Sequence, residues 1–161
     1  MLLSKDASEK LLRNLLTKFH LELEILEEGS KILGTYWGEP EAGLIKNTVY
    51  IRPDTPIQSL LHESCHAICV DGKRRESLHT DAGGRTPVEE NAVCYLQILL
   101  ADEIPEMGQK RMLSDMDDWG YSFRLGSAKR WFEEDADDAR QWLIKYGLID
   151  ERDKVRFVLR K

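Results

Sequence analysis

The five residues from 62 to 66, His-Glu-Ser-Cys-His, are the feature of this sequence that most constrains its fold and chemistry. On an α-helix, side chains four residues apart lie on one face, so His62 and His66 can bind one metal ion from the same side. Glu63 follows the first histidine, where its carboxylate can reach water at the metal without binding the metal itself. This H-E-x-x-H spacing is typical of zinc hydrolases. It predicts zinc ligands at His62 and His66 and a catalytic base at Glu63.

The residues on either side of this motif carry the signals of a helix that follows a strand. Residues 47–52 are rich in β-branched and aromatic side chains and end at a proline, which predicts a short strand. Asp54 or Thr55 can cap the next helix, and Pro56 suits its first turn. Gly72 is a typical helix end. The two histidines should therefore lie in the middle of a well-bounded helix.

The rest of the sequence predicts an α+β fold. Hydrophobic periodicity and turn residues indicate further helices over residues 8–19, 87–101, 107–119 and 127–146, and further strands over residues 21–26, 31–37 and 154–160. This order predicts a small, mostly antiparallel sheet with helices packed on one face. We expect one domain over residues 1–161, with a core at about 8–105 and a helical C-terminal extension at about 106–161.

Composition narrows the choice of partners and of cellular compartment. The 161 residues carry a net charge of −6 and no basic block, which argues against nucleic acid as a direct ligand. No segment approaches the run of roughly twenty apolar residues that spans a bilayer, and the first residues turn polar too soon for a signal peptide. The three cysteines fit a reducing compartment. We therefore expect a cytoplasmic protein with no membrane partner.

A catalytic zinc site needs a third protein ligand besides the two histidines. Four residues downstream of the motif have suitable side chains: His79, Asp81, Glu89 and Glu90. Glu89 shares a predicted helix face with apolar Ala92 and Val93, where a carboxylate is costly unless it is paired or binds a metal. Residues 86–89 also read as a capping box, in which Glu89 turns back to the helix start and leaves Glu90 as the ligand. We expect Glu89 to bind the metal, with Glu90 as the alternative.

A short strand, the H-E-x-x-H helix and a second helix with Glu-x-x-Ala-x-x-aromatic together resemble the gluzincin metallopeptidases. The nearest in shape are the minimal, ImmA/IrrE-like members, whose second helix commonly reads Glu-x-x-Ala-Asn-x-Phe-Ala and then Leu-Leu. The matching positions here are Glu89, Ala92, Tyr95, Leu99 and Leu100. Val93 departs from the family, which usually has a polar residue there. The resemblance covers residues 47–105 and implies a zincin-like fold.

The motif and the resemblance together predict a zinc-dependent metallopeptidase. Glu63 would take a proton from metal-activated water and pass it to the leaving amine. The partner would be a peptide or protein substrate, added in extended form to the edge of the strand at 47–52. Candidates for the oxyanion donor are His79, Tyr95, Tyr121 and Arg124. The alternative is a non-catalytic zinc-binding regulatory or adaptor domain on the same scaffold.

Overall fold

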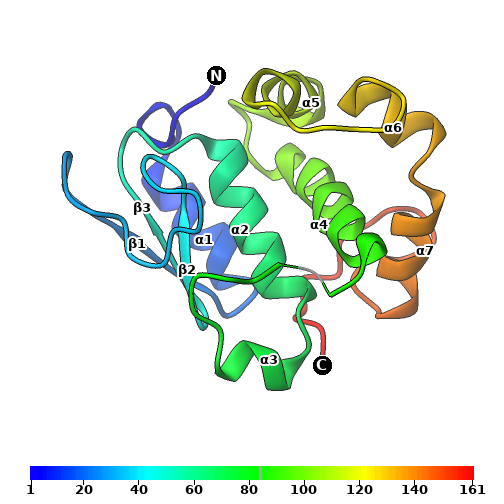
Figure 1. Ribbon diagram of the computed structural model, residues 1–161, viewed down its shortest axis with the longest axis horizontal. Coiled ribbons are helices and arrows are strands. Elements are labelled where there is room, and N and C mark those ends of the chain that lie inside the picture. Colours follow the sequence, from blue (N-terminus) through cyan, green and yellow to red (C-terminus); the bar gives the residue numbers. More distant parts are fainter. Residues whose placement is uncertain (84) are drawn as a thin grey trace.

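Three short strands form a mixed sheet in the computed structural model, which describes residues 1–83 and 85–161 (Figure 1). The strands are β1 (Glu22–Ile25), β2 (Gly43–Ile45) and β3 (Thr48–Ile51), in the spatial order β1-β3-β2. The central strand β3 runs parallel to β1 and antiparallel to β2. The α+β class is confirmed, but the expected mostly antiparallel sheet is replaced by one pair of each kind.

One face of this sheet is buried and the other faces solvent. Leu23, Val49 and Leu44 stand in register across the three strands, and each is almost completely buried. Glu22 and Glu24, whose side chains alternate with Leu23 on β1, are exposed. This alternation means that the helices cover a single face of the sheet, as the sequence predicted.

The residues described contain seven α-helices: α1 (Glu9–Thr17), α2 (Ile57–Cys69), α3 (Gly72–Glu76), α4 (Pro87–Leu100), α5 (Gly108–Trp119), α6 (Ala128–Glu134) and α7 (Asp137–Lys145). Helix α1 packs against β1, and α2 packs against β2 and β3. In Figure 1, α2 and α4 run side by side through the middle of the molecule, with α7 against the far side of α4. Both central helices are buried over most of their surface, as their apolar sequences require. Within the described residues, no helix is long and apolar enough to cross a membrane.

The segment 31–37 does not form the expected strand. Gly34 has a φ of 70°, which bends the chain away from an extended conformation. The segment crosses β2 without forming a ladder of backbone hydrogen bonds. The Gly34 carbonyl accepts one hydrogen bond from the Leu44 amide at 3.1 Å. The crossing is close, since a Cβ at Gly43 would lie 1.7 Å from the Leu33 carbonyl oxygen. Glycine at position 43 therefore permits this packing.

The single long helix expected over 127–146 is interrupted. It forms α6 and α7, separated at Asp135 and Ala136, whose backbones leave the helical conformation. The Asp135 carboxylate pairs with Arg124 in the preceding loop. Two acidic residues in the first turn of α7 then favour a new helix start through the helix dipole.

The expected C-terminal strand over 154–160 is also absent. Its alternating residues form one isolated bridge, between Ile149 and Val155, and Phe157 has a positive φ of 51°. Beyond that residue the tail lies against the end of α2, where the Arg160 amide donates to the Ile68 carbonyl at 3.0 Å. The alternating residues therefore form a tail with one side packed against the core, and within the described residues no strand pairs with it.

Candidate metal centre

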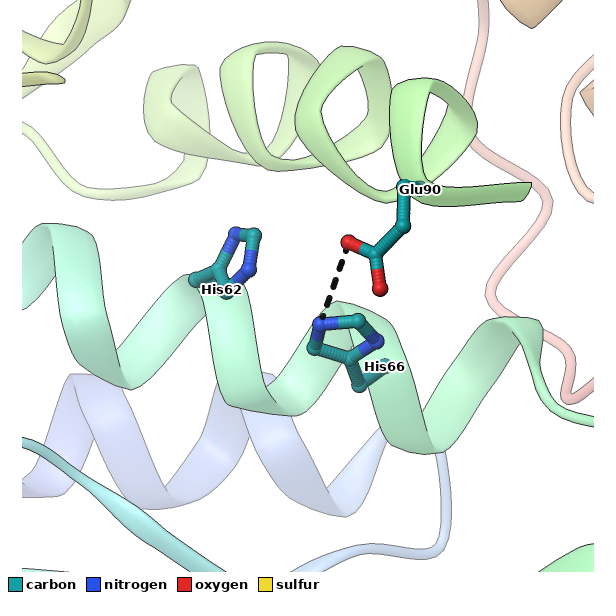
Figure 2. Close-up of side chains that lie close together, drawn as sticks. All are labelled: His62, His66 and Glu90. Carbon is teal, nitrogen blue, oxygen red and sulfur yellow. Dashed lines mark ion pairs between the residues drawn. The ribbon is translucent and has the colours of Figure 1, made fainter. Parts of the chain in front are cut away.

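His62 and His66 on α2 and Glu90 on α4 bring three potential metal ligands together (Figure 2). Each offers one ligand atom, and these atoms all lie within 4.8 Å of one another. The His66 Nε2 and Glu90 Oε2 atoms are 3.7 Å apart, and the two imidazole rings have centroids 4.7 Å apart. Figure 2 shows Glu90 reaching down from α4 toward the rings, which both rise from α2. The helical spacing of the motif thus places the two imidazoles as the sequence predicted.

The third member of the group is Glu90, and this reverses the expected preference for Glu89. Glu89 is buried, but its carboxylate is held by two arginines: the Arg160 Nη1 lies 3.0 Å from one oxygen and the Arg74 Nη1 lies 3.3 Å from the other. The Arg85 amide donates to the same carboxylate at 2.8 Å. The negative charge of Glu89 is therefore compensated by two arginines and needs no metal. The neighbouring Glu90 faces α2.

The start of α4 explains why consecutive glutamates separate in this way. The Thr86 hydroxyl caps the helix by accepting from the Glu89 amide at 3.2 Å, so half of the predicted capping box is present. The Glu89 carboxylate accepts from Arg85 instead of from Thr86. Consecutive helical residues point about 100° apart. With Glu89 held against the two arginines, Glu90 is turned toward the cleft above α2.

Gln97, which the sequence analysis missed, orients the first histidine. Its Oε1 lies 2.9 Å from the His62 Nδ1, and its Nε2 donates to the Gln58 carbonyl at 3.0 Å. Because a backbone carbonyl can only accept, the nitrogen of the Gln97 amide must face Gln58 and its oxygen must face His62. His62 therefore carries its proton on Nδ1 and leaves the Nε2 lone pair for a metal. Gln97 follows Glu90 by two helical turns, and this spacing is the signal in the sequence that could have identified it.

Both histidines are held in the neutral state that binds metal. Burial lowers the pKa of His62, against a hydrogen bond to Gln97 that raises it. Burial also lowers the pKa of His66 well below its usual value, and the nearby His62 and Arg74 act in the same direction. A hydrogen bond to the Ala82 backbone opposes this change and holds the His66 ring. Neutral imidazole is the form that metals require, so neither ligand has to lose a proton at neutral pH.

Glu63 lies next to the ligand group in a nearly closed environment. Only 9% of its surface is exposed, and it lines the same cavity as the two histidines. Burial, followed by the negative charges of Glu41 and Glu90, raises the pKa of Glu63 to about 8. A cation bound at the histidines would act in the opposite direction: it would favour the ionised carboxylate and so lower the pKa of Glu63. The position suits a group that takes up and releases a proton.

The ligand group lies where two cavities meet, which together we call the cleft. The first lobe, of about 310 Å³, is bordered by the loop at 80–83. The second lobe, of about 500 Å³, is bordered by Glu41, Trp119 and Tyr121. Both lobes are lined by Trp37, His62, Glu63 and Glu90. A substrate in the cleft would therefore pass directly over the candidate metal ligands.

The other candidate third ligands lie outside the group. His79 is exposed, and its Nδ1 lies 2.7 Å from the Thr80 hydroxyl. Asp81 borders the first lobe but accepts a hydrogen bond from the Gly83 amide. The four ligand candidates are thus reduced to Glu90 by the geometry of the described residues.

Of the expected oxyanion donors, Tyr121 borders the cleft. Its ring lies 5.4 Å from the His62 ring, and its hydroxyl donates to the Gln58 Oε1 at 2.7 Å. Tyr95 donates to Asp153, and Arg124 pairs with Asp135 away from the metal group. The Tyr121 hydroxyl is already engaged in the network that holds Gln97, so its visible role is structural.

The strand at 47–52 cannot accept a peptide as expected, because β3 is the central strand and has neighbours on both sides. The outer edge of β2 is also covered. The Lys46 amide donates to the Leu78 carbonyl at 2.7 Å, and the Thr80 amide donates to the Leu44 carbonyl at 2.9 Å. Neither β3 nor the outer edge of β2 is therefore open to pairing with a further strand.

Comparisons of this chain with protein-family models, with curated proteins and with solved structures found no match.

The two adjacent glutamates should respond differently to the same substitution. We expect Glu90→Gln to weaken zinc binding at least about 100-fold, since it removes one of three protein ligands. Glu89→Gln should lower the free energy of unfolding by about 2 kcal/mol, since it leaves two part-buried arginines without their carboxylate, and should affect zinc less. Competition with a chelator measures the affinity, and urea denaturation of the metal-free proteins measures the stability. A larger loss of zinc affinity in Glu89→Gln would contradict the assignment.

Gln97 should affect zinc affinity without touching the metal. Gln97→Met keeps the length of the side chain but removes the acceptor for His62, and we expect zinc affinity to fall about 10-fold to 100-fold. The same substitution at Gln141, which is exposed on α7, is the control and should leave the affinity unchanged. Equal affinities in the Gln97 and Gln141 variants would show that His62 needs no such support.

Proposed function

We propose that this protein is a zinc-dependent metallopeptidase, with zinc held by His62, His66 and Glu90. The observation that carries the proposal is the meeting of two neutral imidazoles and one carboxylate beside Glu63, at the floor of an open cleft. Two histidines and one glutamate are a known ligand set of catalytic zinc, which keeps its remaining position for water or substrate. The cleft gives access to that position. The residues present fit zinc in two respects: their donor atoms are of the kind that zinc binds, and the cleft leaves the ion accessible to water or substrate.

The chain's own residues would perform the proton transfers. Bound zinc supplies Lewis acidity, which lowers the pKa of water at the ion and polarises the substrate carbonyl. Glu63 accepts a proton from the attacking water at a carboxylate oxygen and delivers it to the nitrogen of the leaving amine. Gln97 keeps the His62 Nδ1 protonated and its Nε2 directed at the ligand group.

A peptide or protein is the substrate that suits the shape of the cleft. The two lobes of the cleft share the residues His62, Glu63 and Glu90, which lie where the lobes meet. An extended chain crossing from one lobe to the other would bring one peptide bond to Glu63. Trp37 borders both lobes and can contact either side of that bond.

A second function, a zinc-binding regulatory or adaptor domain without activity, is favoured by one observation. β3 is enclosed and the outer edge of β2 is covered by residues 78–80, so the main-chain pairing that would align a peptide is missing here. Against this, a purely structural zinc site has no use for a base, and Glu63 lies beside the ligands in a position to act as one. We therefore prefer the peptidase.

Glu63→Gln should separate metal binding from catalysis. Glutamine keeps the shape and cannot accept the proton, so we expect zinc content to stay at one per chain while the rate of hydrolysis falls at least about 100-fold. Zinc is measured by elemental analysis, and hydrolysis by mass spectrometry of a diverse peptide library. Treatment of the wild-type protein with a chelator is the control.

Equal cleavage by Glu63→Gln and wild type would remove Glu63 from the mechanism. If the zinc-loaded wild-type protein cleaves nothing in the library, the regulatory domain becomes the better description.

A further inference from the structure

The second lobe of the cleft contains a carboxylate, Glu41, that the proposed hydrolysis does not use. Glu41 is half-buried just before β2, and it borders this lobe together with Trp37 and Trp119. One of its oxygens accepts a hydrogen bond from the Ser59 hydroxyl. The other accepts from the Trp119 Nε1 at 2.5 Å. Two neutral donors therefore fix the carboxylate in place without neutralising its charge.

Among the described residues, no lysine or arginine side chain lines the second lobe beside Glu41. The other two carboxylates of this lobe belong to the candidate metal centre, since Glu90 is one of its three ligands and Glu63 lies beside them. The ion pairs found among the described residues do not include Glu41. A carboxylate without an ion-pair partner in a part-buried recess attracts a cation, because the low-dielectric walls screen its charge less than water does. This lobe is therefore suited to a cationic group that comes from outside.

Aromatic rings complete the lobe. Trp37 is 77% exposed and Trp119 is 39% exposed, so both indole rings are accessible to a group that enters the lobe. Indole is the aromatic ring that attracts ammonium and guanidinium groups most strongly. The Trp119 indole is also fixed by its hydrogen bond to Glu41. The carboxylate and a ring are thus held as one unit at the wall of the lobe.

We propose that the second lobe recognises a positively charged nitrogen group of the substrate, which pairs with Glu41 and stacks on Trp37 and Trp119. The proposal rests on the peptidase function proposed above and names its substrate class. The charged group has two sources in a peptide: an arginine or lysine side chain close to the cleaved bond, or the α-ammonium group of the first residue. Both share the chemistry that the lobe offers, and the choice between them decides whether the protein acts within chains or at their amino ends.

The test measures peptide binding to a protein that does not turn over. The parent is the zinc-loaded Glu63→Gln protein, and titration calorimetry gives the Kd of alanine-based peptides. One set moves a single arginine through every position, and a matched set has neutral citrulline in its place. Each peptide is made with a free and with an acetylated amino end. We expect one of the two charges to tighten binding by about tenfold or more, because it gains an ion pair in a part-buried recess.

Variants then locate the preference. Glu41→Gln keeps the size of the side chain and should abolish the charge preference while leaving the neutral peptides unchanged. Glu24→Gln removes the same charge from the exposed face of β1 and should keep the full preference. Trp37→Ala changes a side chain that is largely in solvent, so its folding is secure, and it should reduce the preference several-fold.

Equal Kd values for charged and neutral peptides would overturn the proposal, as would a preference that survives in Glu41→Gln. An equal loss in Glu24→Gln would assign the effect to the overall charge of −6 and would also overturn it. Because binding is measured in a protein without its base, these outcomes are distinct from a failure of the peptidase proposal, which appears as absence of cleavage by the wild-type protein.

Discussion

The packing of α2 against α4 is the contact on which the candidate site depends. The two histidines come from one helix and Glu90 from the other, so the ligand group exists only while these helices keep their separation and rotation. Most residues of both helices are buried, and their apolar contacts supply the stability of this pairing. A polar site is thereby built at the rim of an apolar core.

Two sets of polar contacts hold α4 in position near the candidate metal ligands. Gln97 joins the two helices through His62 and the Gln58 carbonyl, and it fixes the protonation of the histidine at the same time. Glu89 anchors the start of α4 to Arg74 and to Arg160 of the C-terminal tail. The Arg160 guanidinium is itself 4.0 Å from the ring centroid of Tyr146. The tail thus has a structural reason to lie where it does, because it holds the turn that carries Glu90.

The sequence predicted best what depends on local signals. The expected metal helix and the helix from 87 to 101 agree closely with α2 and α4, because apolar spacing and prolines lie within each segment. The expected caps of the metal helix are wrong, since neither Asp54 nor Thr55 caps α2 and Gly72 begins α3. The choice between Glu89 and Glu90 was not local. A helical wheel identifies Glu89 as the inward residue, but whether a cation or a metal meets it depends on Arg160, which is 71 residues away along the chain. The expected strands at 31–37 and 154–160 differ for a related reason: alternation shows which face is buried and not whether a partner strand is available.

The proposed zinc site consists of two imidazole nitrogens and one carboxylate oxygen. X-ray absorption at the zinc edge of the purified, zinc-loaded protein tests it most directly. We expect one zinc per chain, surrounded only by nitrogen and oxygen at about 2.0–2.2 Å, with the scattering pattern of two imidazole rings. Sulfur at about 2.3 Å, or a signal from fewer than two imidazoles, would contradict it.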